Sequence, residues 1–469
     1  MRIKMVLPAL AEATDPLFRP IKYSLFPPLG LATLAGHCPN DEVTIEDEHV
    51  GAIRLDDEPD VVVIQTYVTS AYRAYALADH YRSQGAHVCL GGLHPTSLPG
   101  EAAAHADTIF MGPGEDTWPR FLSDFRAGRP QPVYRSTERS LHGVPRARRD
   151  LIDRSRYLVP NSIVVSRGCP HSCDFCYKDA FYQGGRSFYT ARVDDALDEI
   201  ASLEGRHLYF LDDNLFADDR FARELMAGLR GTGRVWQAAG TVESVLRPGL
   251  LEAAAASGLR SLFVGFETLD QTALTEQGKR HNVGRDYDEA IRRLHDAGVM
   301  VNASFVFGMD HHGPDVFDRT AEWAVSRGIE TATFHVLTPY PGTALHTRME
   351  REGRITTRDW DLYDTRHCVI SHPTMSPQTI EAGYHRARTA FYSWSGIARA
   401  SLARESAAEQ LRHFAYSAAW KKAGSVWDAA ISLGLLRHAR PALERVLDGV
   451  RRPRESVAPG LEAASGTTL

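Results

Sequence analysis

Apolar runs of strand length alternate with segments of helical period along most of the chain, which is typical of parallel α/β structure. The pattern forms two arrays, over about residues 1–130 and 161–345. In the first array, helices are predicted near 29–37 and 70–83, and strands near 2–7, 42–47, 60–66, 86–91 and 107–111. Five strands with helices between them predict a doubly wound, Rossmann-like sheet, whose ligands bind at the carboxyl ends of the strands.

The second array contains six strand-like runs, at 163–165, 208–211, 235–239, 262–266, 301–307 and 332–337. Six consecutive β/α units predict an open (β/α)6 barrel with its active site on the loops that follow the strands. We therefore expect an α/β protein with a proline-rich linker over 131–160. In that linker the basic run 146–149 is most simply a solvated charge cluster, of which one or two arginines could meet an anionic ligand.

Composition is that of an ordinary soluble protein, with 469 residues, 43% apolar residues and 24% charged residues. A formal net charge of −6 gives no reason to expect nucleic acid as a partner. The N-terminus lacks a signal-peptide core, and nowhere do eighteen apolar residues follow one another, so the cytoplasm is the expected location.

Three cysteines in one short loop carry the clearest chemical signal. Cys169, Cys173 and Cys176 have C-x3-C-x2-C spacing and directly follow the first strand of the predicted barrel. Three thiolates can hold three irons of a [4Fe–4S] cluster, and no fourth cysteine follows at ferredoxin spacing to bind the last iron. The open iron makes this a site for chemistry rather than for electron transfer alone.

Two other interpretations of the loop remain open at this point. His171 with the three cysteines could form a Cys3His zinc site, or the thiols could be buried without a metal. The isolated Cys38, Cys89 and Cys368 are expected to be reduced, buried side chains.

Polar residues gather where strands of both arrays end. In the barrel these are Asp212, Asp213, Asn214, Thr241, Glu243, Ser244, Glu267 and Thr268. Such groups can contact a ligand at the barrel mouth or cap the helix that follows, and both roles stay open. In the first array the strand-end candidates are Tyr67, Thr69, Ser70, Gly91, Gly92, His94, Gly112, Gly114 and Glu115. Glycine allows a ligand close to the backbone, but no G-x-G-x-x-G motif points to a dinucleotide. The alternative is a sheet that binds nothing and docks a partner.

The cysteine loop, with Phe175 directly before the third cysteine, resembles the signature of the radical S-adenosylmethionine (SAM) superfamily. The resemblance implies that the open iron chelates SAM, which is cleaved to a 5′-deoxyadenosyl radical. It also implies SAM contacts from the loop, the strand-four segment 264–268 and other strand ends, namely Phe175, Tyr177, Asp212, Glu243, Glu267 and Ser304.

The first array resembles the cobalamin-binding domain that precedes many radical SAM domains. The resemblance rests on the segment 26–31, on Gly-Gly-x-His-Pro at 91–95 and on Gly-x-Gly-Glu at 112–115. The motif D-x-H-x-x-G, which supplies a histidine to cobalt, is absent, and His49 is expected to be a solvated loop residue rather than a ligand.

The C-terminal region changes in character. Helices are expected over 346–453, part of which could close the barrel mouth, and a disordered tail over 454–469. Residues 401–453 hold nine Lys or Arg against five Asp or Glu, with aromatic and leucine residues between them. These helices are expected to pack on the barrel, and the alternative is peripheral contact with a membrane.

The combined expectation is a cobalamin-dependent radical SAM enzyme that methylates an unactivated carbon or phosphorus of a small-molecule substrate. An external electron donor such as flavodoxin or ferredoxin would reduce the cluster. A cyclase or mutase that uses cobalamin without methyl transfer is the alternative within the class. A redox-sensing iron–sulfur binding protein is the alternative of another class.

Overall fold

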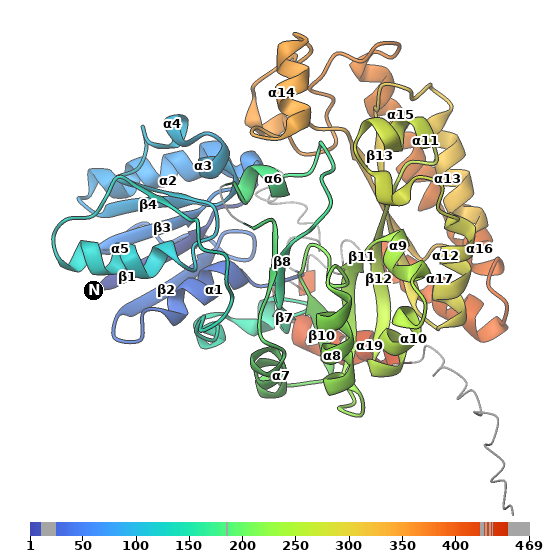
Figure 1. Cartoon of the computed structure of the whole chain (residues 1–469), viewed down its shortest axis with the longest axis horizontal. Helices are drawn as coiled ribbons and strands as arrows, with labels where there is room; N and C mark the ends of the chain where they lie inside the picture. Colours follow the sequence, from blue (N-terminus) through green and yellow to red (C-terminus); the bar gives the residue numbers. More distant parts are fainter. Residues whose placement is uncertain are drawn as a thin grey trace, which may run out of the picture.

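The computed structural model describes residues 1–10, 25–183, 186–422, 426, 429–430, 433 and 435–448. Two parallel sheets stand side by side, the N-terminal one blue and the second one green to yellow (Figure 1). One cluster of buried apolar side chains runs from the α2 side of the first sheet into the second, and a separate cluster fills the opposite face of the first sheet. The two sheets are therefore joined by a shared core.

The N-terminal sheet has the strand order β2-β1-β3-β4-β5-β6, and every pairing is parallel. Its strands are β1 (Arg2–Leu7), β2 (Glu42–Asp47), β3 (Val61–Gln65), β4 (His87–Gly91), β5 (Thr108–Met111) and β6 (Val133–Arg135). Its helices are α1 (Leu29–Gly36), α2 (Ala71–Ser83), α3 (Leu93–Ser97), α4 (Pro99–Ala102) and α5 (Thr117–Arg126). The order reverses at β1, so a ligand crevice is expected between the carboxyl ends of β1 and β3.

The five predicted strands of this sheet are confirmed, but the sheet is one strand longer than predicted. Strand β6 pairs with β5 from Ile109↔Val133 to Met111↔Arg135, inside the stretch expected to be linker. Three residues between prolines carry too little periodicity to be recognised as a strand. The remainder of the stretch contains the 3-10 turns η4 (Arg149–Leu151) and η5 (Arg154–Arg156).

The second sheet is an open parallel sheet of six strands in the order β14-β13-β12-β11-β10-β7. Its strands are β7 (Ser162–Ile163), β10 (His207–Phe210), β11 (Val235–Gly240), β12 (Leu259–Glu267), β13 (Met300–Phe307) and β14 (Thr331–Val336). Its helices and turns are α6 (Lys178–Phe181), α7 (Val193–Ser202), α8 (Asp219–Leu229), α9 (Val242–Leu246), α10 (Leu250–Ser257), α11 (Gln271–Glu276), η6 (Arg280–Asn282), α12 (Tyr287–Asp296) and α13 (Val316–Ser326). This is the predicted partial barrel.

An antiparallel hairpin that the sequence pattern did not predict flanks the cysteine loop. It pairs β8 (Ser166–Gly168) with β9 (Phe188–Thr190). The loop therefore starts from a fixed strand.

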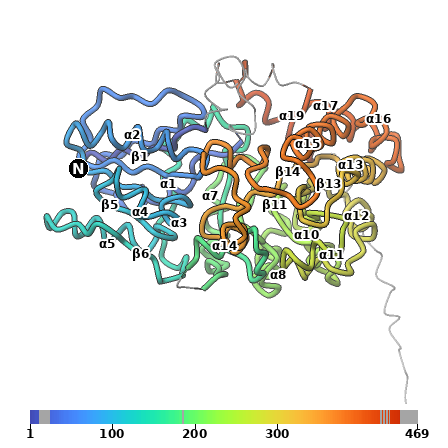
Figure 2. Tube along the Cα trace, turned by 90° about the horizontal axis from the view of Figure 1, so that it is seen from above, coloured from blue at the N-terminus to red at the C-terminus, as the bar shows by residue number. Residues whose placement is uncertain are grey.

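The C-terminal region is helical, as expected, and its residues 394–422 lie on the side of the barrel away from the N-terminal sheet (Figure 2). It contains α14 (Ala344–Arg351), η7 (Trp360–Leu362), α15 (Pro377–Phe391), α16 (Trp394–Leu402), α17 (Ala407–Lys422) and α19 (Leu436–Asp448). No helix among the described residues is long and apolar enough to cross a membrane. The predicted tail, 454–469, lies outside the described residues.

Candidate functional site

The cysteine loop leaves β8 at a position that requires glycine. Gly168 has φ +79°, and a Cβ there would collide with the carbonyl oxygen of Ser187. The amide of Cys169 donates to that carbonyl at 3.0 Å, and the amide of Cys176 donates to the carbonyl of Cys173 at 3.1 Å. Burial raises the pKa of the Cys173 thiol to about 11 and that of Cys176 to about 12, and each is raised further by the other thiols nearby. The three thiols thus lie together at one end of the barrel.

Asp213 joins the two ends of the loop. Its Oδ2 accepts from the amide of Gly168 at 2.8 Å, and its Oδ1 accepts from the hydroxyl of Tyr177 at 2.5 Å. These partners are the residues directly before Cys169 and directly after Cys176. The carboxylate therefore closes the loop at its base.

Asp212 supports the strand segment that precedes the cysteine loop. It is buried and accepts hydrogen bonds from the amides of Val165 and Ser166 and from the Ser166 hydroxyl. Burial raises its pKa to about 7. The side chain therefore fixes the backbone that leads into the cysteine loop.

Asn214 approaches the loop directly. Its Nδ2 donates to the Sγ of Cys169 at 3.7 Å, while its buried Oδ1 has no hydrogen-bond partner within the part of the chain that the structure describes. A buried amide oxygen without a donor is costly, so it is suited to a donor from a ligand.

A buried ion pair lies beside the thiols. Glu267, at the end of β12 with φ +63°, accepts from Nζ of Lys279 at 2.5 Å, and the Ser304 hydroxyl lies 3.5 Å from its other oxygen. Burial lowers the pKa of Lys279, but Glu267 and the thiol of Cys173 raise it by more, so the ammonium stays charged. The predicted Glu267 and Ser304 are thus brought together, whereas Lys279 had no distinguishing sequence signal.

Glu243 lies in the first turn of α9 and forms a 3.6 Å ion pair with Arg247. Burial lowers the pKa of His171, a residue of the cysteine loop, and the charge of Glu243 opposes this shift. The His171 ring stacks on that of His281, with ring centroids 3.7 Å apart. Thr241 and Ser244 form the capping box of α9, which settles their role as helix caps. Thr268 bonds to His312 at 2.9 Å, and Phe175 packs against the main core.

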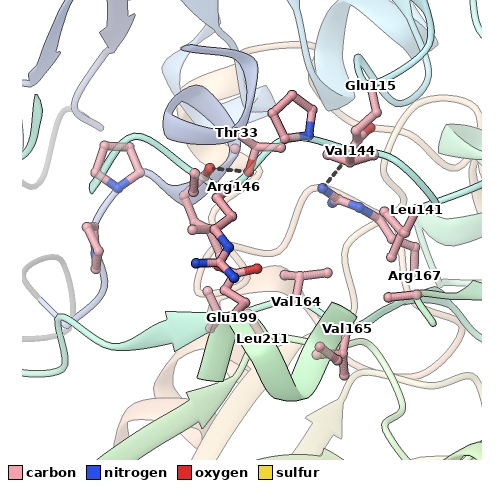
Figure 3. Close-up of a pocket in the computed structure, with 18 of the residues that line it drawn as sticks. Thr33, Glu115, Leu141, Val144, Arg146, Val164, Val165, Arg167, Glu199 and Leu211 are labelled. Atoms are coloured by element: carbon pink, nitrogen blue, oxygen red, sulfur yellow. Dashed lines mark hydrogen bonds and ion pairs between the residues drawn. The ribbon is translucent and has the colours of Figure 1, made fainter. Parts of the chain in front are cut away.

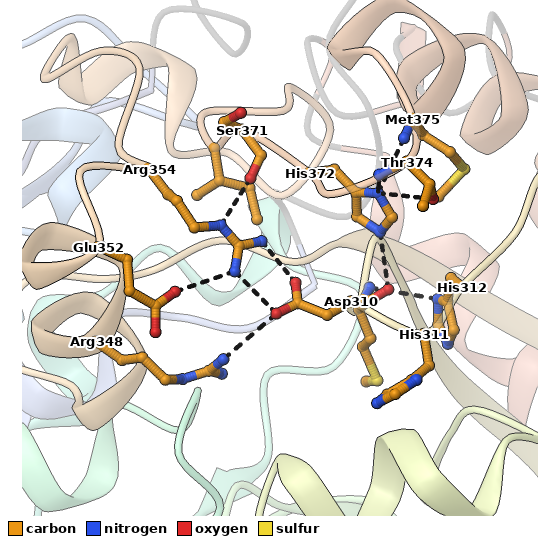
Figure 4. A network of polar contacts seen from close by, with 12 residues as sticks. Asp310, His311, His312, Arg348, Glu352, Arg354, Ser371, His372, Thr374 and Met375 are labelled. Atoms are coloured by element: carbon orange, nitrogen blue, oxygen red, sulfur yellow. Dashed lines mark hydrogen bonds and ion pairs between the residues drawn. The ribbon is translucent and has the colours of Figure 1, made fainter.

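A polar network connects the loop to the C-terminal region. Asp174, between Cys173 and Phe175, accepts from Nη2 of Arg348 at 2.9 Å. Arg348 also pairs with Asp310 at 3.6 Å, and Arg354 binds the same carboxylate at 2.6 Å (Figure 4). Helix α14 therefore holds the loop through Asp174.

A cavity of about 660 Å³ lies between the two sheets (Figure 3). It is lined from the N-terminal sheet by Tyr67 and Glu115 and from the barrel by Arg167, at the carboxyl ends of the strands. Arg146, which is exposed as expected, also lines it, whereas Arg149 is half-buried in a 2.9 Å ion pair with Glu199 and departs from the solvated cluster that we expected.

A smaller cavity of about 130 Å³ continues into the N-terminal sheet. Its walls include the predicted Gly91, Gly92, Gly112, Gly114 and Glu115. A Cβ at Gly114 would lie 3.0 Å from Leu34, another wall residue. The absent side chains keep this slot open.

An ion pair between Arg167 and Glu115 joins the two halves of the site. Arg167 is two residues before Cys169, and Glu115 ends the Gly-x-Gly-Glu motif. Glu115 raises the pKa of Arg167, against the effect of burial, so the guanidinium stays charged. Arg167 was missed because nothing in the sequence distinguishes it from other arginines.

Three N-terminal candidates, His94, Ser70 and Thr69, are not among the residues that line these two cavities. His94 is fully buried and bonds to Tyr75 and Glu101 at 2.8 and 3.1 Å, away from the walls of both cavities. Ser70 is buried and accepts from the amide of Tyr67, while Thr69 is half-buried beside it. These residues shape the strand-end backbone.

The expectation of a solvated His49 is wrong. The ring is buried and bonds to Asp47 at 2.8 Å, and Asp47 also accepts from the Tyr157 hydroxyl at 2.9 Å. The hydrogen bond to Asp47, at the end of β2, accounts for the buried position of the His49 ring. The buried Cys38, Cys89 and Cys368 match the prediction.

Residues 163–339 match the model of the radical SAM superfamily. The chain carries a radical SAM domain. Residues 343–455 match a domain of unknown function, DUF4070. The radical SAM domain comprises the partial barrel and the cysteine loop, so the cysteine motif has the context that its spacing predicted.

Similarity to known proteins covers most of the chain. Bacteriochlorophyllide d C-12(1)-methyltransferase of Chlorobaculum tepidum is 28% identical over 76% of this chain and 80% of its own length. The fold resembles that of TsrM, a radical SAM methyltransferase from Kitasatospora setae solved with cobalamin and a [4Fe–4S] cluster, with TM-score 0.61, 14% identity and coverage of 94% and 99%. It also resembles OxsB, a cobalamin-dependent radical SAM enzyme, with TM-score 0.65, 13% identity and coverage of 96% and 78%.

Proposed function

We propose that this protein is a cobalamin-dependent radical SAM methyltransferase that methylates an unactivated carbon, or phosphorus, of a small-molecule substrate. The observation that carries the proposal is the Arg167–Glu115 ion pair, which brings the cysteine loop and the strand ends of the N-terminal sheet to one cavity. When bound, the cluster and one SAM would supply a 5′-deoxyadenosyl radical, and cobalamin would deliver a methyl group that it receives from a second SAM.

The residues present fit the cluster and SAM. Cys169, Cys173 and Cys176 would hold three irons and leave the fourth open. Glu267 and Lys279 offer opposite charges beside the loop, which suits the ammonium and carboxylate of an amino acid such as SAM. Ser304, Glu243 and Asn214 border the same region, whereas Asp212 and Tyr177 position the loop.

The N-terminal cavities fit cobalamin. The glycine-lined slot would take the nucleotide tail, because the missing side chains of Gly91 and Gly114 leave room against the sheet. The larger cavity would take the corrin ring, with Tyr67 on its wall. His49 bonds to Asp47 and lies outside the set of residues that line either cavity, so we assign it no role as a cobalt ligand.

Methyl transfer is favoured over cyclisation or rearrangement by the similarity to a curated methyltransferase over most of both chains. The electron that starts the reaction would come from an external donor such as flavodoxin or ferredoxin. The alternatives of a zinc site and of a redox-sensing binding protein lose their support, since the loop lies within a matched radical SAM domain.

The test uses protein reconstituted anaerobically with iron and sulfide and then given hydroxocobalamin. After gel filtration, the corrin absorbance should stay with the protein, and SAM with dithionite should yield 5′-deoxyadenosine. Gly114→Leu should block cobalamin retention but spare SAM cleavage, because it fills the slot without touching the loop. Gly100→Leu, where a Cβ meets nothing within 4 Å, is the matched control. Cobalamin retained equally by both variants would contradict the assignment of the slot.

A further inference from the structure

Helix α17 packs on the barrel through buried polar side chains as well as through Tyr416 and Trp420. His413 and Ser417 are buried, and they donate to the carbonyls of Ile329 and Glu330 at 3.1 and 2.8 Å. The Glu330 carboxylate lies in a buried group with His295 and Arg404. These bonds fix the rotation of α17 about its axis, because turning the helix would leave buried polar groups without partners.

The outward side of α17 is consequently apolar. Leu411 is 71% exposed and Phe414 is 36% exposed. The other exposed positions of the same helix before its C-terminal lysine include Ala407, Ala408 and Ala415. An ordinary surface helix buries its apolar side and exposes charges, so α17, which leaves Leu411 and Phe414 outside, departs from that pattern.

Helix α16 extends this exposed apolar side. Trp394 is 57% exposed and stacks on Phe414 with ring centroids 6.0 Å apart, and Leu402 is 69% exposed. The two helices lie at the edge of the molecule farthest from the N-terminal sheet in both views (Figures 1 and 2). We call the exposed side chains Trp394, Leu402, Leu411 and Phe414 the α16–α17 face.

Positive charge accompanies this face. Nζ of Lys422 lies 5.4 Å from the centroid of the Trp394 ring. Helix α17 contains Arg412, Lys421 and Lys422 against Glu409 alone, although the whole chain carries −6. Excess positive charge is thus concentrated in the segment that exposes apolar side chains.

We propose that the α16–α17 face rests on the surface of an anionic lipid bilayer. Leucine, phenylalanine and tryptophan side chains next to lysine are the combination by which interfacial helices bind such surfaces, through apolar burial and attraction to acidic headgroups. Folding on the barrel fixes the helix in the orientation that contact needs. The proposal is independent of the proposed methyl transfer.

The test is co-sedimentation of the full chain with vesicles of phosphatidylcholine mixed with phosphatidylglycerol. Binding should be salt-sensitive and weak on phosphatidylcholine alone, because the headgroup charge contributes. The double variant Leu411→Ser/Phe414→Ser should lower the bound fraction about tenfold. The matched control Leu55→Ser/Val133→Ser changes two exposed apolar residues of the N-terminal sheet region and should bind as the unaltered protein does.

Other occupants of the face give distinct results. If a second copy covers it, sedimentation velocity without lipid will show an oligomer that the double variant converts to a monomer, and vesicle binding will be absent. If residues 449–469 cover it, binding will appear only after they are removed. Either result, or equal binding by the double variant and its control, would overturn the proposal.

Discussion

The hydroxyl of Tyr177 donates to the carboxylate of Asp213 at 2.5 Å, across the base of the cysteine loop. Because the same carboxylate accepts from the amide of Gly168, one side chain fixes the chain on both sides of the three thiols. A cluster held by three thiolates depends on the backbone that presents them, so the Tyr177–Asp213 bond should govern how firmly the cluster is retained.

Tyr177→Phe should therefore weaken cluster retention without preventing folding. A hydrogen bond to a charged group contributes roughly 1.5 kcal/mol or more, which corresponds to about a tenfold faster loss of the cluster. The measurement is the decay of cluster absorbance in the presence of an iron chelator under anaerobic conditions. Tyr72→Phe, which removes an exposed hydroxyl outside the loop, is the control, and equal decay of both variants would show that the bond has no such role.

Replacement of Cys169, Cys173 or Cys176 by Ala should abolish cluster absorbance and SAM cleavage while the chain stays folded. Each thiol would bind a different iron, so two cysteines cannot substitute for three. Iron analysis and 5′-deoxyadenosine formation check the result. Cys368→Ala serves as the control, since that thiol is buried away from the loop and should leave both readouts intact. Retained SAM cleavage in any single loop variant would refute the assignment.

Arg348→Gln should loosen the loop from the C-terminal region. The Arg348–Asp174 ion pair is partly exposed, so we expect a loss of about 1 kcal/mol, or roughly fivefold faster cluster decay. Arg354→Gln is a sharp control, because Arg354 binds the shared Asp310 through two nitrogens but is not bonded to Asp174. If both variants decay alike, the effect arises from the Asp310 region as a whole rather than from the contact with the loop.

Sequence alone predicted the parallel strands and the cysteine loop. Both depend on residues close together in the chain, the strands on short apolar runs and the loop on the spacing of its cysteines. It missed β6 and the β8–β9 hairpin, whose strands of three residues are too short to show periodicity. The partners of the loop are distant in the chain: Asp213 is 36 residues from Tyr177, and Arg348 is 174 residues from Asp174. No local pattern encodes such pairs.

Helix α17 shows a second limit of sequence patterns. Its composition predicts a helix that packs on the barrel, but the side that packs is decided by the partners that the barrel offers. The carbonyls of Ile329 and Glu330 select His413 and Ser417, and the aromatic Phe414 is turned outward as a result.

The buried carboxyl of Asp212 predicts a specific dependence of stability on pH. Burial raises its pKa to about 7, above the ordinary value of 3.8, so the folded protein holds a proton that the unfolded chain releases near pH 4. The stabilisation from this group is complete below pH 4 and is lost as the pH rises toward 7, at about 1.4 kcal/mol per pH unit. The amide in Asp212→Asn cannot ionise, so this variant should lack the pH-dependent part of the stability that comes from Asp212.

The thermal midpoint of the unaltered protein, relative to that of Asp212→Asn, should therefore be higher at pH 5 than at pH 7.5. Comparing the two proteins at each pH cancels the titration of all other groups, provided that they are not coupled to Asp212. Asp60→Asn, which changes a carboxyl on the surface, provides the control. A difference for Asp212→Asn that is constant, or that grows with pH, would show that the carboxyl is ionised in the folded protein and is stabilised by the amides of Val165 and Ser166.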